Sequence, residues 1–268
     1  MIATEAHAPA QAVLAATVIL IRDTPGGLET LMVERHHGMD FARGATVFPG
    51  GKVAVADHDD RLRDRCADAG LDDLQRALRV AAARETFEES GLLIARRGGR
   101  VLGAGGCAEL WRRWHRRVIA SAGAFVDMIC DEGLELVLDL LVPYAQWVTP
   151  EISSKRFDTY FFVAQAPAGQ LAVHDGFEAI DSFWVRPVDA LAECEQRRRV
   201  IMFPTLCNLA LLAQAADVTS ALKAAQHRKV DCSQPMLARR ADGKITPVLA
   251  ADSGYPALSG MLMDQVAR

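Results

Sequence analysis

Residues 84–91 read Arg-Glu-Thr-Phe-Glu-Glu-Ser-Gly, and they end a stretch in which apolar residues recur at helical spacing. An aspartate pair at 72–73 can cap the start of this stretch, and Gly91 stands where a helix carries its C-terminal glycine. The pattern therefore predicts a helix over about residues 72–90.

Three carboxylates share one face of this helix, because Glu85, Glu88 and Glu89 are spaced i, i+3 and i+4. Like charges at this spacing repel by roughly 0.2–0.5 kcal/mol, and the helix dipole disfavours negative charge in the last turn. A hard divalent cation such as Mg²⁺ would reverse the sign of that energy, since it prefers carboxylate and water oxygens. The alternative is a solvated acidic helix end.

A strand followed by a glycine turn, Phe48-Pro-Gly-Gly51, lies upstream of the helix. Together the two segments resemble the Nudix hydrolase family, whose signature begins with a glycine and ends in an Arg-Glu, Glu-Glu and Gly pattern. The positions that fit this signature are Gly51, Arg84, Glu85, Glu88, Glu89, Gly91 and Leu92.

Two departures from the signature are present. Arg84 lies 19 residues further from Gly51 than in the family pattern, and Asp57 replaces the first glutamate. Long surface insertions cost little closure entropy, so both ends of an interrupted motif can stay in place. The interrupted motif is similar to that of the peroxisomal-type coenzyme A diphosphatases. Further similarity lies at Trp147–Pro150, Lys155–Thr159 and Phe203–Thr205.

The resemblance implies an α/β fold, an α/β/α sandwich with a mixed central sheet, a helical insertion and a C-terminal extension. It also implies that water cleaves a diphosphate with the help of Mg²⁺ or Mn²⁺. Glu88 and Glu89 would be the principal metal ligands, with Glu85 a further ligand or a positioner of one. The Gly51 carbonyl would complete the shell, and Arg84 would orient the carboxylates.

Three residues outside the motif are candidates for the same site. Glu178 lies in a predicted loop and is the candidate base, with an exposed loop carboxylate as the alternative. Lys155 and Arg156 precede a strong predicted strand and could reach a substrate phosphate. The alternative for this pair is a set of edge-strand charges that prevents aggregation.

The chain divides around one expected Nudix domain at residues 12–216. We expect a disordered N-terminus at 1–11, insertions at about 52–70 and 107–141, the latter helical, and a C-terminal extension at 217–268. The extension would pack on the domain or on a partner. Trp111 and Trp114 share one face of the second insertion and predict a core-facing amphipathic helix.

The composition and net charge limit the classes of binding partner that we expect. The 268 residues carry a formal net charge of −4, which gives no reason to expect a nucleic acid or an anionic membrane. No apolar run reaches the roughly 18 residues of a membrane span. The cysteines form no close pairs and no secretion signal is evident, so we expect a cytoplasmic protein with reduced thiols. The extra helices and the tail make a homodimer plausible.

The predicted activity is divalent-metal-dependent hydrolysis of a small-molecule nucleoside diphosphate derivative, with coenzyme A or an acyl derivative favoured by the interrupted motif. ADP-ribose and NADH remain alternative substrates. A non-catalytic Nudix-like ligand-binding module is the second hypothesis, motivated by Asp57 and by the extra residues within the motif.

Overall fold

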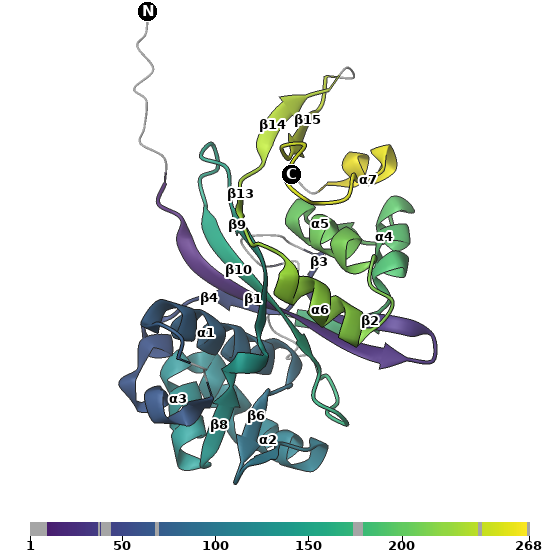
Figure 1. Ribbon diagram of the computed structural model, residues 1–268. Helices are drawn as coiled ribbons and strands as arrows, with labels where there is room; N and C mark the ends of the chain where they lie inside the picture. The colour runs from purple at the N-terminus through teal and green to yellow at the C-terminus, as the bar shows by residue number, and fades with distance from the viewer. Residues whose placement is uncertain are drawn as a thin grey trace, which may run out of the picture.

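The computed structural model describes residues 10–36, 38, 44–67, 70–173, 179–240 and 243–266. Its centre is a mixed sheet (Figure 1), and the strands of this sheet are β1 (Val13–Thr24), β2 (Gly27–Arg35), β3 (Ala45–Val47), β4 (Gly50–Lys52), β9 (Val142–Val148), β10 (Phe157–Gln165), β11 (Ala179–Val185), β12 (Val200–Ile201) and β13 (Cys232–Ser233). The order is β12-β3-β2-β1-β10-β9-β13, with β4 paired to β1 and β11 to β2. Since β1 runs parallel to β10 and antiparallel to β2, the sheet contains both kinds of pairing.

Strand β1 is apolar on both faces because both faces are covered. Its alternation sends Ala16, Val18 and Leu20 into one buried cluster and Ile19 and Ile21 into the other. A continuous apolar run with this period-2 division is typical of a strand buried between two layers of helices.

The first layer packs on one side of the sheet and contains α1 (Asp73–Ser90), α2 (Ala104–Ala120) and α3 (Ala122–Asp131). It also holds a small second sheet of β5 (Cys66–Ala67), β6 (Ala95–Arg97), β7 (Arg100–Val101) and β8 (Leu134–Val137), and the short 3-10 turns Val55–His58, Asp60–Arg65 and Leu138–Leu140. Figure 1 shows this layer in blue and teal, below the sheet.

The helix predicted over 72–90 is confirmed together with its caps. The Asp72 side chain accepts a hydrogen bond from the Gln75 amide at 2.7 Å, and Gly91 takes a left-handed φ of +68°. The prediction of a helical insertion over residues 107–141 is wrong past Asp131. Gly133 turns the chain with a φ of +60°, and the short apolar run that follows becomes strand β8.

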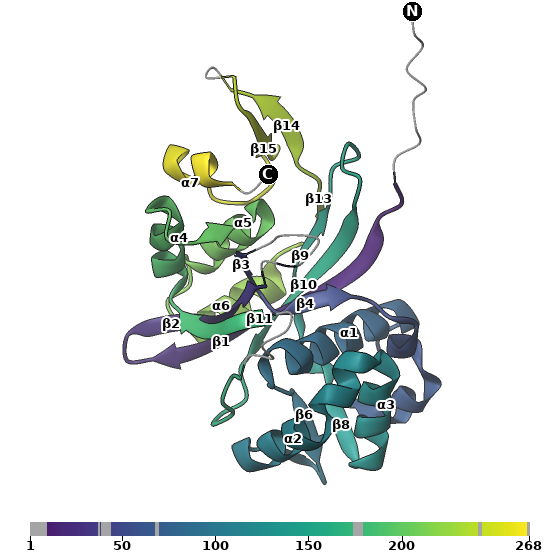
Figure 2. The same ribbon diagram turned by 180° about the vertical axis from the view of Figure 1, so that it is seen from behind.

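The second layer covers the opposite face with α4 (Pro187–Glu195), α5 (Phe203–Leu212) and α6 (Val218–His227). Figure 2, seen from behind, again shows α1–α3 and α4–α6 on opposite sides of the sheet. The predicted α/β/α sandwich is therefore confirmed. Helix α6 was not predicted from the sequence, although Asp217 caps it by accepting a hydrogen bond from the Ser220 amide at 2.7 Å.

The C-terminal segment continues from α6 into the hairpin of β14 (Met236–Arg239) and β15 (Ile245–Val248) and then into α7 (Gly260–Gln265). It packs on the second layer, where α7 contacts α4, and on the sheet, where the Tyr255 ring lies 5.1 Å from that of Trp147 of β9. Within the described part of the chain, no helix is long and apolar enough to cross a membrane.

Candidate active site

The end of α1 lies against β4, and the two glycines of the Pro-Gly-Gly turn allow this contact. A Cβ atom on Gly51 would lie 2.4 Å from the carboxyl carbon of Glu85, and one on Gly50 would lie 2.4 Å from Thr17 Oγ1. Real Cβ contacts are never this short, so a side chain at either position would displace the strand or the carboxylate. The glycine turn is therefore needed to place β4 beside the carboxylates of α1.

Arg84 is buried beneath the carboxylates and connects them. Its Nη1 donates to Glu85 at 2.8 Å and to Glu88 at 2.9 Å, and its Nη2 donates to the Lys52 carbonyl at 2.9 Å. Burial disfavours the charged guanidinium, but the hydrogen bond with Asp57 and the surrounding carboxylates outweigh it and hold the pKa of Arg84 above its ordinary value. Arg84 thus stays charged and brings Glu85 and Glu88 together on one nitrogen.

Asp57 explains how the altered motif still orients its arginine. The side chain is 2% exposed and accepts from Arg84 Nε at 2.8 Å and from Nη2 at 2.9 Å. It also accepts from the Ala54 amide at 2.8 Å. The aspartate that departs from the family signature therefore forms a two-point ion pair with Arg84, and the extra residues follow it without separating the pair.

Glu89 lies deeper than the other two glutamates. One carboxylate oxygen accepts from the Gly50 amide at 3.0 Å, and the other lies 3.6 Å from Arg35 Nη1. Arg35 ends β2, and the sequence analysis did not select it. Glu89 thus ties the helix to both β4 and β2.

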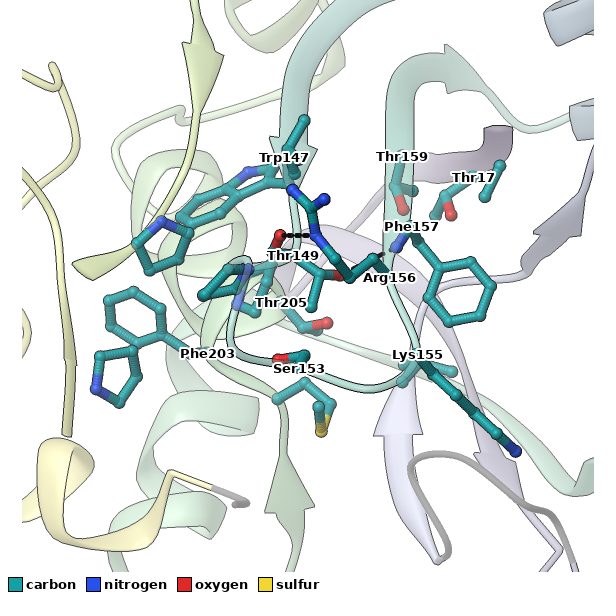
Figure 3. A pocket seen from close by; sticks show the side chains of 18 of the residues that line it. Thr17, Trp147, Thr149, Ser153, Lys155, Arg156, Phe157, Thr159, Phe203 and Thr205 are labelled. Carbon is teal, nitrogen blue, oxygen red and sulfur yellow. Dashed lines mark hydrogen bonds between the residues drawn. The ribbon is translucent and has the colours of Figure 1, made fainter. Parts of the chain in front are cut away.

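A cavity of about 1200 Å³ borders this cluster, and Figure 3 shows part of its lining. Glu85 and Glu88 line it, and so do the predicted substrate-binding residues Lys155 and Arg156. Arg156 donates two hydrogen bonds to the backbone, from Nε to the Thr149 carbonyl at 3.1 Å and from Nη1 to the Ala10 carbonyl at 2.8 Å. The structure therefore brings the predicted basic pair and the two glutamates to one cavity.

The donor set fits a hard divalent cation whose shell the substrate completes. In the part of the chain that the structure describes, no three acidic, histidine or cysteine side chains converge as a preformed metal cage. Glu85 and Glu88 nevertheless share Arg84 Nη1 as a partner, and both line the cavity together with Gly51. Mg²⁺ commonly binds through one or two carboxylates, several waters and substrate phosphates, and this is the donor chemistry present.

Helix α2 supports the end of α1 from the far side. His115 Nε2 lies 3.1 Å from the Glu88 carbonyl oxygen, and Cys107 Sγ donates to the Gly91 carbonyl at 2.9 Å. The Trp111 ring meets the Phe87 ring edge-on at 5.5 Å. The predicted core-facing stripe of α2 is thus confirmed, and it supplies partners to carbonyls that the helix end leaves unpaired.

The candidate base Glu178 lies outside the described residues. The neighbouring Ala179 begins β11, and its backbone pairs in register with Arg35 of β2. The residues that sequence reasoning missed are Arg35 and Lys52, both in the cavity lining. Their signals are weak, since each is a single basic residue at the end of a strand.

Comparisons with known proteins agree with this geometry. The family model described as the NUDT19 Nudix domain matches residues 63–212, more than half of the chain. The chain therefore belongs to the Nudix hydrolase family and is an enzyme that hydrolyses diphosphate linkages. Nudix hydrolases generally use divalent cations.

Two curated relatives and one crystal structure are similar over most of the chain. Acyl-coenzyme A diphosphatase NUDT19 of Xenopus laevis is 27% identical over 85% of this chain and 71% of its own length. The Gallus gallus protein of the same name is 25% identical over 90% and 79%. The crystal structure of a Nudix hydrolase from Alicyclobacillus acidocaldarius has a TM-score of 0.71 and 27% identity, covering 80% of this chain and 96% of that chain.

Proposed function

We propose that this enzyme hydrolyses the diphosphate of coenzyme A or of an acyl-coenzyme A, with Mg²⁺ or Mn²⁺ as cofactor. The observation that carries the proposal is the position of Glu85 and Glu88 at one end of a large cavity that also contains basic and apolar residues. Support also comes from the names of the frog and chicken relatives, which are acyl-coenzyme A diphosphatases.

The reaction adds water across the P–O–P bridge and releases two phosphate monoesters. When bound, the divalent cation neutralises the diphosphate oxygens and activates the attacking water. Glu85 and Glu88 would hold it with the Gly51 carbonyl, and Glu89 would hold the helix against the glycine turn or join the shell. Arg84 keeps Glu85 and Glu88 on one side of the cavity.

The remaining residues position the substrate. Lys155 and Arg156 line the cavity, and cationic side chains there would offset the charge of the diphosphate. We propose Glu178 as the base that accepts the proton of the attacking water, since it immediately precedes the residue that pairs with Arg35. The proposal also includes a homodimer and a cytoplasmic location, the latter supported by six free cysteines.

A metal titration with a matched pair of variants tests the proposal. We expect turnover of coenzyme A compounds to stop in excess chelator and to return with Mg²⁺ or Mn²⁺. Glu88→Gln removes a carboxylate from the cavity and should lower kcat by about 100-fold or more. The control Glu109→Gln changes an exposed glutamate of α2 that pairs with Arg113 at 3.6 Å, and it should stay within about twofold of the wild type.

Three outcomes discriminate among the functions. Equal activity of Glu88→Gln and Glu109→Gln would show that the glutamate cluster is a surface feature. Turnover of ADP-ribose or NADH, but not of coenzyme A compounds, would assign the enzyme to the alternative substrate class. Tight, metal-independent binding with no turnover of any diphosphate would support the non-catalytic module.

A further inference from the structure

The cavity extends well beyond the space that a diphosphate fills. Its volume of about 1200 Å³ exceeds the 300–1,000 Å³ typical of small-molecule sites. The additional wall comes from the C-terminal segment, through Pro235, Leu237, Ile245, Pro247, Met263 and Val266. A segment outside the matched Nudix region therefore builds part of the same cavity as the glutamates.

One face of the β14–β15 hairpin forms most of this wall, and Thr246 of the other face is also in the lining. Leu237 pairs with Pro247, and Arg239 pairs with Ile245. Since directly paired residues share a face and successive residues alternate, Leu237 and Ile245 point to one side and Met236 points to the other. Leu237 is 47% exposed and Ile245 is 46% exposed, so both present apolar surface to the open cavity.

The apolar lining continues from the hairpin into the sandwich. The rings of Trp147 and Phe203 meet edge-on at 6.0 Å, and both residues line the cavity. In Figure 3 they lie on the side of the C-terminal segment, whereas Lys155 and Thr17 lie on the side of β1. The cavity thus has the glutamates and Lys155 at one end and a mainly apolar wall at the other, where Lys244 and Asp264 are the charged residues of the lining.

The apolar wall is held in place without a ligand. Arg240, after β14, forms an ion pair with Asp264 of α7. The Arg228 guanidinium lies 4.6 Å above the Tyr255 ring, and Tyr255 packs on Trp147. A preformed apolar wall binds an apolar chain with little ordering cost.

We infer that the C-terminal hairpin, with Trp147 and Phe203, forms a subsite for the acyl chain of the substrate. Leu237 and Ile245 are its specificity-determining residues. The inference rests on the proposed function for the identity of the diphosphate end, and it adds that an acylated compound is preferred over the unacylated one. Because this wall and the glutamates line one cavity, the group that occupies the wall is part of the same substrate.

Calorimetric titration in excess chelator tests the subsite without turnover. The ligands are coenzyme A, butanoyl-coenzyme A and octanoyl-coenzyme A, and the variants are Leu237→Ser and Ile245→Ser. Each methylene moved from water into an apolar site favours binding by about fourfold. We therefore expect the wild type to bind octanoyl-coenzyme A at least about tenfold more tightly than butanoyl-coenzyme A, and each variant to lose most of this difference.

Met236→Ser is the matched control, since Met236 is 62% exposed on the same strand but faces away from the cavity. It should keep the dependence on chain length, as should the conservative variant Leu237→Met. Circular dichroism confirms that each variant is folded. The half-exposed positions of Leu237 and Ile245 make loss of the fold an unexpected result.

The outcomes separate this inference from the proposed function. An affinity that does not rise with chain length, including no binding at all, overturns the acyl subsite. A dependence of affinity on chain length that survives in both serine variants also overturns it. If the serine variants keep that dependence but lose a dimer in size-exclusion chromatography, the face belongs to an interface with a second copy of the chain. Binding that depends on chain length, with no turnover in Mg²⁺ or Mn²⁺, would support the subsite and overturn only the proposed hydrolysis.

Discussion

The ion pair between Asp57 and Arg84 gives the sharpest prediction about how the interrupted motif works. Asp57→Asn keeps the size of the side chain but removes its charge. The carboxylate accepts three hydrogen bonds of 2.8–2.9 Å, two from Arg84 and one from the Ala54 amide. An amide offers one oxygen and places an NH₂ donor against the remaining donors.

The expected loss of stability depends on the hydrogen-bond partners that Arg84 retains in the variant. Breaking a buried ion pair costs about 3–5 kcal/mol, and Arg84 retains Glu85, Glu88 and the Lys52 carbonyl. We therefore expect the low end, about 3 kcal/mol, which lowers Tm by about 6–12 °C for a chain of this size. A tenfold or larger fall in kcat should accompany it, because Arg84 positions both cavity glutamates.

Thermal unfolding followed by circular dichroism measures this effect, and Asp60→Asn is the matched control in the same inserted segment. The Asp60 side chain is 84% exposed and pairs with Arg63 on the surface, so its loss should cost less than about 1 kcal/mol. An Asp57→Asn protein that unfolds within about 2 °C of the wild type would refute the buried pair. One that is destabilised but retains full kcat would refute its positioning role.

Two further predictions test the glycine contact and the buried thiols. Gly51→Ala should lower kcat by about 100-fold, because the new Cβ would press on the Glu85 carboxyl group. The control Gly105→Ala adds a Cβ where nothing lies within 4 Å and should leave kcat unchanged. Steady-state kinetics that give the two variants equal kcat would contradict the contact. Burial raises the pKa of the Cys207 thiol to about 12, so it stays protonated at pH 8 and should resist iodoacetamide in the native protein, whereas exposed Cys232 reacts. Peptide mass spectrometry with equal labelling of both thiols would contradict this packing.

Local signals predicted much of the fold. The helix that carries the glutamates has an aspartate cap and a terminal glycine, and both act as their sequence positions indicate. The turn residues Pro25, Gly26 and Gly27 lie where β1 and β2 meet, and the apolar residues of β1 alternate between two buried clusters. The apolar run at Leu134–Val137 was misassigned because periodicity cannot separate a short buried strand from a helix.

The connections across the site were harder to predict because they join distant segments. Asp57 and Arg84 are 27 residues apart, and Glu89 of α1 lies 3.6 Å from Arg35 at the end of β2. The wall that Leu237 and Ile245 build depends on how the C-terminal segment packs on Trp147, and no spacing in the sequence encodes that packing. The motif therefore located the glutamates, while only the structure located the residues that hold them and the space above them.

The most direct test of the account is mass spectrometry of the products formed from an acyl-coenzyme A with Mg²⁺ or Mn²⁺. Hydrolysis at the diphosphate predicts two phosphate monoesters, adenosine 3′,5′-bisphosphate and the acylated phosphopantetheine, with no product from the Glu88→Gln variant. An intact substrate after prolonged incubation with the folded wild type, or cleavage at the thioester instead of the diphosphate, would contradict it.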